Sequence, residues 1–197
     1  KLVGISGGLA MDNAQKGDDI DLFIITAKNK LWMSRLLALL LLSLTGQRRK
    51  AKDLGKKIAG KLCLNILLEE DKLEQSSKDI FVAHELLQMK VLWQRDEVYK
   101  KYLEDNFWAF KYLPNWTIDL SSPRRRGSNK QNKVINWIPA SAGMTMERIA
   151  KWLQLKIMGT PQGMERIQDG AVYFHPHDIR PQILALYHQK VKAISST

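Results

Sequence analysis

The chain has 197 residues, of which 45% are hydrophobic and 26% are charged, and its formal net charge is +11. This composition is ordinary for a soluble globular protein, and the length allows one α/β domain with a helical addition. The single cysteine, Cys63, excludes a disulfide within the chain and fits a reducing cytoplasm. No secretion signal is visible. Because the chain starts at Lys1 and enters a strand at once, we expect it to lack upstream structure.

Hydrophobic patterning predicts a small mixed sheet followed by helices, an α/β (α+β) fold with a helical C-terminal half. The Leu-rich run from Leu31 to Leu44, interrupted by Arg35, is shorter than the roughly 20 residues that span a bilayer, so it predicts a buried helix. Gly46 suits the end of that helix. The expected elements are strands at 2–6, 19–26 and 62–68, and helices at about 30–45, from Ser76 or Ser77 through Met89, at 95–112, at 146–158 and at about 178–192.

Two carboxylates lie in the second predicted strand, shortly after a pair of glycines. Side chains alternate across a strand, so Asp19 and Asp21 should share one face while Ile20 points to the other. Two such carboxylates repel each other, and a divalent cation between them relieves that cost. Adjacent glycines let the backbone approach a phosphate closely. The pattern therefore predicts a metal–nucleotide site.

These residues resemble the DNA polymerase β-type nucleotidyltransferase superfamily, whose members carry a glycine turn and then Asp-hydrophobic-Asp on a strand. The run from Ser6 to Asp21, and the later segments Lys61–Asn65, Ala83–Lys90 and Phe174–Asp178, are similar to bacterial nucleotidyltransferase-domain proteins. The resemblance covers most of the chain except residues 121–146.

The resemblance implies an Mg²⁺-dependent (or Mn²⁺-dependent) enzyme that transfers a nucleoside monophosphate from a nucleoside triphosphate to an unknown acceptor, which is RNA, a protein or a small molecule. Asp19 and Asp21 would then be the catalytic carboxylates and the metal ligands. Ser6, Gly7 and Gly8 would form the nucleotide-binding turn. Positioning and charge neutralisation are what such a transfer needs most.

Three residues depart from the pattern of that superfamily. Gly8 stands where a serine is frequent, and Met11 stands where minimal members often have an arginine. Asn65 lies near the position of the third carboxylate, where its carbonyl can ligate a metal but cannot act as a base. Glu69 or Glu70 is a possible substitute. A catalytically weakened, binding or antitoxin-like protein is therefore the alternative, and a basic RNA-associated protein is a third.

Four regions are expected along the chain: a nucleotidyltransferase core at 1–75, a helical region at 76–120, an inserted flexible segment at 121–146 and a C-terminal helical region at 147–197. The insert resembles the translation of a mobile palindromic repeat; an Arg-rich RNA-binding arm is the alternative. Most of the positive charge lies in residues 47–61 and 121–145, where a basic loop could hold nucleic acid or the triphosphate, or be a solvated surface. His84 is expected to pack, and residues 175–178 to mark the entry to the last helix.

Overall fold

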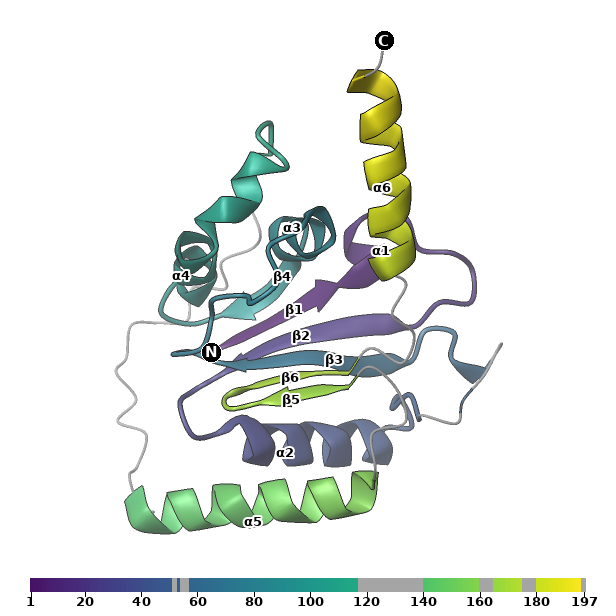
Figure 1. Cartoon of the computed structure of the whole chain (residues 1–197). Coiled ribbons are helices and arrows are strands. Elements are labelled where there is room, and N and C mark those ends of the chain that lie inside the picture. The colour runs from purple at the N-terminus through teal and green to yellow at the C-terminus, as the bar shows by residue number, and fades with distance from the viewer. Residues whose placement is uncertain (51–52, 54–56, 117–139, 160–164, 175–179, 196–197) are drawn as a thin grey trace.

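A six-stranded mixed β-sheet with helices on both faces forms the centre of the molecule (Figure 1). The computed structural model describes residues 1–50, 53, 57–116, 140–159, 165–174 and 180–195. The strand order is β4-β1-β2-β3-β6-β5. Strands β2 and β3 run parallel, and the other neighbouring pairs are antiparallel. The mixed α/β fold expected from the sequence is confirmed.

The first three strands and the helix between the second and third follow the prediction closely. The strands are β1 (Leu2–Ser6), β2 (Ile20–Thr26), β3 (Leu62–Glu69), β4 (Lys90–Gln94), β5 (Arg166–Gln168) and β6 (Ala171–Tyr173). The helices are α1 (Gly7–Ala10), α2 (Leu31–Leu44), α3 (Ile80–Leu87), α4 (Val98–Asp105), α5 (Ala140–Met158) and α6 (Arg180–Ser195), and a 3₁₀ helix, η2, covers Phe107–Lys111. Helix α2 makes the crossover between the parallel strands β2 and β3, as a parallel pair requires.

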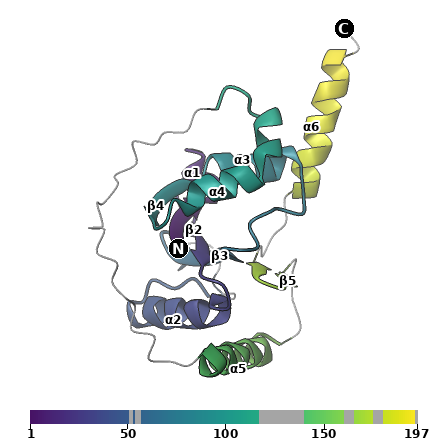
Figure 2. The ribbon, with the colours of Figure 1, turned by 90° about the vertical axis from the view of Figure 1, so that its left-hand side faces the viewer.

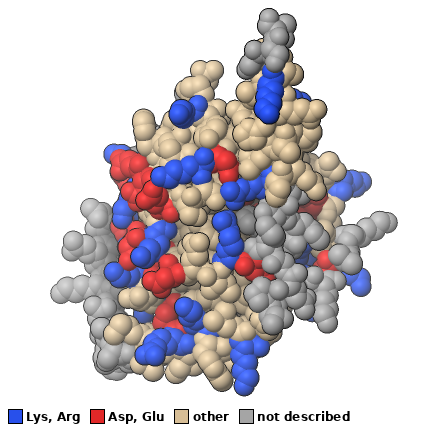
Figure 3. Space-filling view, in the orientation of Figure 1, with Lys and Arg blue, Asp and Glu red and all other residues tan. Residues whose placement is uncertain are grey.

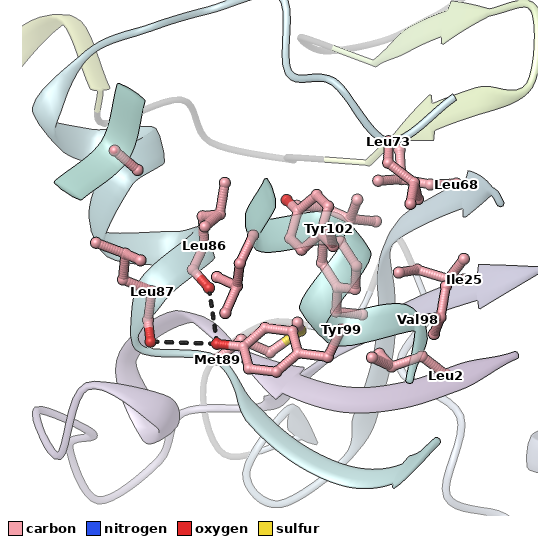
Figure 4. Packing of buried hydrophobic residues seen from close by; sticks show 14 of the residues in the cluster. Leu2, Ile25, Leu68, Leu73, Leu86, Leu87, Met89, Val98, Tyr99 and Tyr102 are labelled. Atoms are coloured by element: carbon pink, nitrogen blue, oxygen red, sulfur yellow. Dashed lines mark hydrogen bonds between the residues drawn. The ribbon is translucent and has the colours of Figure 1, made fainter. Parts of the chain in front are cut away.

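The two faces of the sheet build two apolar cores, because side chains alternate along β2. Phe23 and Ile25 pack with α3 and α4, whereas Leu22 and Ile24 face α2 and α5. Figure 2 shows these helix pairs on opposite sides of the strands. In the first core the hydroxyl of Tyr99 donates to the carbonyl oxygens of Leu86 and Leu87, at 3.2 and 3.4 Å (Figure 4). These two hydrogen bonds connect α4 to the end of α3.

The predicted burial of helix α2 between the sheet and another helix is confirmed on one side only and is wrong for its outer edge. Leu31, Trp32 and Leu42 are buried between the sheet and α5. The leucines at positions 37, 40, 41 and 44 are each more than half exposed. Helix α5 lies along α2 and leaves this edge uncovered (Figure 1). Within the described residues, no helix has both the length and the apolar character needed to cross a membrane.

Helix α5 supplies the N-terminal cap that α2 lacks in its own sequence. The residue before α2, Lys30, makes no side-chain cap. Instead the carboxylate of Glu147 in α5 accepts hydrogen bonds from the backbone N–H of Trp32 and of Met33, at 2.5 and 2.9 Å. A carboxylate there also matches the positive end of the helix dipole. The Gln154 amide oxygen accepts from Arg35 at 2.6 Å, so a second polar side chain of α5 fixes the pair.

Several elements differ from the sequence prediction. The strands β4, β5 and β6 were not predicted, because β4 is mostly exposed and the other two have three residues each. Asp79, rather than Ser76 or Ser77, caps α3, and its carboxylate accepts from Val82 N at 3.1 Å. The helix predicted at 95–112 is divided into α4 and η2. Helix α5 begins at Ala140, so the end of the predicted flexible insert is helical; its residues 121–139 lie outside the described residues.

Charged side chains of both signs are interspersed on the face seen in Figure 1, as the space-filling view in Figure 3 shows. Lys61 in the predicted basic loop pairs with Asp53 at 3.2 Å, and Arg49 pairs with Asp19. The described cations of this face therefore do not form one continuous basic patch. Nucleic-acid binding by the basic segments stays a prediction.

Candidate metal centre

The two predicted carboxylates lie at the start of β2, on the α3 side of the sheet. Asp21 alternates with Leu22 and shares the face of Phe23 and Ile25, which enter the core under α3 and α4. Asp19 directly precedes the strand, and its carboxylate lies within 4.8 Å of that of Asp21. The two acids therefore converge on one site, as their spacing predicts.

A cysteine thiol completes this cluster from the neighbouring strand. The parallel register pairs Asp21 with Cys63, and the Sγ atom lies within 4.8 Å of ligand oxygens of both aspartates. Sequence reasoning treated Cys63 as a small apolar residue, because it lies in the run Leu62–Leu68. Its role as a neighbour of Asp21 depends on the β2–β3 register, which the sequence does not specify.

The end of β1 brings the predicted nucleotide-binding turn to the same place. Ser6 pairs with Asp21 in the antiparallel β1–β2 ladder, so their side chains lie on one face. Ser6 is 1% exposed, and its Oγ has no hydrogen-bond partner among the described residues. Gly7 has φ +66, and a Cβ there would overlap the Asp21 Oδ2 atom. Gly8 is exposed, and the nearest atom to an added Cβ, the Asn13 carbonyl oxygen, is 3.6 Å away.

Arg49, in the segment that follows α2, contacts the site through Asp19. Its Nη1 atom donates to Asp19 Oδ2 at 2.5 Å, and the two side chains are only 16% and 14% exposed. The Arg49 backbone N–H donates to the carbonyl oxygen of Leu62 at 3.0 Å, which holds this segment beside the start of β3. The positive charge of the guanidinium also opposes the rise in the pKa of the Cys63 thiol. The basic composition of residues 47–61 is the sequence signal for such a cation, but it does not single out Arg49.

Burial and like charge dominate the electrostatics of the cluster. Burial, together with the negative charge of Asp19, raises the pKa of Asp21 to about 7, although Arg49 opposes the shift. Burial, together with the charges of Asp21 and Asp19, raises the pKa of Cys63 to about 12. Near neutral pH, Asp21 is therefore partly protonated and Cys63 is a thiol. A bound cation would favour the ionised form of both groups.

The three candidate substitutes for a third carboxylate do not lie beside Asp21 in the ladder. Asn65 falls at a bulge of β3, between the pairs that Leu64 and Ile66 make with β2. It is 4% exposed, and its Oδ1 atom has no hydrogen-bond partner among the described residues, so its role as a metal ligand stays a prediction. Glu69 pairs with Thr26, about 16 Å along the strand from Asp21 by the usual rise per residue, and Glu70 follows it.

The further candidate His84 has a local hydrogen-bond partner. The Nδ1 atom of His84 is 2.9 Å from the side-chain oxygen of Gln88, one turn along at the end of the same helix. Residues 175–179, with both remaining predicted histidines, lie outside the described residues. A hollow of about 420 Å³ near the far end of β3 is lined by four acids and contains none of the predicted site residues; the acids are Asp71, Glu74, Asp105 and Asp169.

The donor set fits a divalent cation. Two carboxylates are hard oxygen ligands of the kind that hold Mg²⁺ or Mn²⁺ together with substrate phosphates, and a thiol adds a softer donor. Burial and the charge of Asp19 make the ionised form of Asp21 unfavourable in free energy, and a bound cation would offset that cost. Comparisons of the chain with protein-family models, curated proteins and solved structures found no match.

Proposed function

We propose that the chain is a divalent-cation-dependent nucleotidyltransferase that transfers a nucleoside monophosphate from a nucleoside triphosphate to an acceptor that is RNA, a protein or a small molecule. The observation that carries the proposal is the convergence of Asp19 and Asp21 on one face of β2, next to the turn at Gly7. A carboxylate pair alone is common on protein surfaces. A half-buried pair beside a left-handed glycine is a more specific feature.

Each group of the site has a distinct task in this proposal. Asp19 and Asp21 would hold Mg²⁺ or Mn²⁺, and the cation, when bound, would offset the charge of the triphosphate. Ser6 has a buried hydroxyl without a partner among the described residues, which could donate to a phosphate oxygen. Gly7 has no Cβ, so the Asp21 carboxylate can lie against the turn whose backbone would approach the phosphate. The acceptor oxygen would bond to the α-phosphorus as pyrophosphate leaves, and its proton would pass to water.

A second function, binding without turnover, is favoured by the neighbour of Asp21 on β3. That neighbour is the thiol of Cys63 rather than a carboxylate, and Arg49 already pairs with Asp19. A site with two acids can bind a nucleotide and its metal while lacking the group that activates the acceptor. In this case the protein would act through binding, for instance as an antitoxin-like partner.

Nucleotide binding tests the site itself. We expect an Asp19→Ala/Asp21→Ala double variant to lose Mg²⁺-dependent binding of all four nucleoside triphosphates, measured by calorimetry. The matched control is Asp18→Ala, because Asp18 adjoins the pair but is exposed, and its carboxylate accepts from the Gln15 N–H instead. Unchanged binding by the double variant would show that the assigned site is wrong.

Transfer of label separates turnover from binding. The protein is incubated with cell RNA and protein and with each nucleoside triphosphate labelled at the α-phosphate. The proposed enzyme activity is supported if label appears on an acceptor, if this transfer requires the divalent cation, and if it disappears in the double variant. Metal-dependent binding with no labelled acceptor supports the binding protein.

A further inference from the structure

Cys63 occupies the position beside Asp21 where a third ligand to a metal would come from β3. We propose that the thiolate of Cys63 is a ligand of the bound cation, and that the site therefore binds Zn²⁺ or Co²⁺ more tightly than Mg²⁺. This inference rests on the proposed function, because it names the class of metal at the same site. It adds a ligand and a selectivity that the two aspartates by themselves do not imply.

The register of three strands places the donors in one row. Ser6 of β1 pairs with Asp21 of β2, and Asp21 pairs with Cys63 of β3. Ligand atoms of Asp19, Asp21 and Cys63 all lie within 4.8 Å of one another. Two ligands on opposite sides of one zinc ion are at most about 4.5 Å apart, which is the sum of a Zn–S and a Zn–O bond. Small side-chain movements would bring all three onto one ion.

A second observation points independently to a ligand in this row. The Ser6 hydroxyl lies beside Asp21 on the same face, is 1% exposed and has no hydrogen-bond partner among the described residues. A buried hydroxyl without a partner costs free energy unless a bound group or a water satisfies it. The row therefore contains an unsatisfied polar atom as well as three potential ligands.

The chemistry of the donors determines the selectivity. Carboxylates suit Mg²⁺, Mn²⁺ and Zn²⁺, but a thiolate discriminates strongly in favour of Zn²⁺ and Co²⁺. Binding would displace the thiol proton, so that Cys63–SH and M²⁺ give Cys63–S–M⁺ and H⁺, with the proton released to the buffer. The guanidinium of Arg49, which now pairs with Asp19, supplies the positive charge that the ion would replace.

Co²⁺ is the probe that tests this coordination directly. A thiolate bound to Co²⁺ gives an intense near-ultraviolet charge-transfer band, whereas oxygen ligands alone do not. The chain has one cysteine, so such a band in the wild-type protein can arise only from Cys63. We expect the band to saturate at equimolar Co²⁺, to be lost on addition of Zn²⁺, and to persist in excess Mg²⁺. Co²⁺ binding without this band, or no binding at all, would overturn the inference.

Two variants at the same position test the selectivity. Cys63→Ser should lose the band and weaken Co²⁺ binding by at least about tenfold while leaving Mg²⁺ binding unchanged. Cys63→Asp should lose the band and bind Mg²⁺ more tightly than the wild type, because it supplies the third carboxylate. Co²⁺ affinity equal to that of the wild type in Cys63→Ser would overturn the inference. If either variant fails to fold, the wild-type Co²⁺ spectrum still shows whether Cys63 binds the metal.

Two results separate the role of Cys63 as a metal ligand from the proposed nucleotidyltransferase activity. Mg²⁺-dependent nucleotide binding that requires Asp19 and Asp21, together with the absence of the charge-transfer band, would reject only the role of Cys63. A charge-transfer band without nucleotide binding would support the metal ligand and reject the nucleotidyltransferase. The two measurements use different probes, so neither result determines the other.

Discussion

The Arg49 guanidinium donates to the Asp19 carboxylate at 2.5 Å, and this ion pair joins the segment after α2 to the start of β2. The two side chains are mostly buried, so the pair is screened less than a surface salt bridge. Arg49 thus supplies a positive charge at the position where a cation bound to Asp19 would lie. The proposed metal would therefore compete with this guanidinium for Asp19.

Replacement of Arg49 should separate its contribution to stability from its competition with a bound metal. We expect Arg49→Gln to lower the free energy of unfolding by about 1 to 3 kcal/mol, because Asp19 loses a charged hydrogen-bond partner. The same variant should bind Mn²⁺ more tightly in the absence of nucleotide, because the competing charge is gone. Urea unfolding and calorimetric titration measure the two effects, and Lys50→Gln is the exposed control. Weaker Mn²⁺ binding would show that Arg49 assists the metal instead.

Asp21→Asn should stabilise the metal-free protein. The pKa of Asp21 is raised from 3.8 to about 7, so between these values the folded state holds a proton that the unfolded state has lost. The resulting stability is complete below pH 3.8 and is lost as the pH rises through 7. We therefore expect Asp21→Asn to be more stable than the wild type by roughly 1 to 4 kcal/mol at pH 8, with little difference at pH 4.

Chemical unfolding of both proteins across this pH range checks the prediction, with Mn²⁺ omitted and then added. Added Mn²⁺ should stabilise the wild type and not the variant, since only the wild type has both carboxylates. A variant that is less stable than the wild type at pH 8 would mean that the ionised Asp21 is well satisfied without a metal.

The two glycines of the turn should respond differently to alanine. Gly7→Ala should destabilise the fold by about 1 to 2 kcal/mol or more, because its φ of +66 disfavours a side chain and the new Cβ would overlap Asp21. Gly8→Ala should leave stability almost unchanged, since the new Cβ would make only ordinary van der Waals contacts. If Gly8 contacts the triphosphate, this second variant should weaken nucleotide binding alone. Thermal unfolding measures the effect of each variant on stability, and nucleotide titration measures its effect on binding.

The link between α5 and α2 should be a major source of stability on that side of the sheet. Glu147→Ala removes the acceptor of two backbone N–H groups at the buried start of α2. We expect a loss of about 1 to 3 kcal/mol in the free energy of unfolding, and a smaller loss for Glu147→Gln, which keeps an acceptor. The neighbouring exposed Arg148→Ala serves as the control in denaturant unfolding. Equal stability of Glu147→Ala and wild type would contradict this assignment.

Local patterns were sufficient to predict the elements that surround the site. The apolar runs at β1, β2 and β3 and the leucine-rich helix α2 were found because each is a continuous segment with its own periodicity. The strands β5 and β6 were missed because three residues carry little periodic signal. Strand β4 was missed because its five residues are mostly exposed and do not alternate between buried and exposed positions. The predicted burial of α2 was wrong on the edge that α5 leaves open.

The sequence by itself determined that Asp19 and Asp21 share a face, because alternation along a strand is a property of the local backbone. It also placed a glycine turn shortly before them. Only the tertiary structure decided that Cys63 lies beside Asp21, that Arg49 pairs with Asp19 and that Glu147 caps α2. These contacts join segments far apart in the chain, and they depend on strand register and helix packing, which no local pattern encodes.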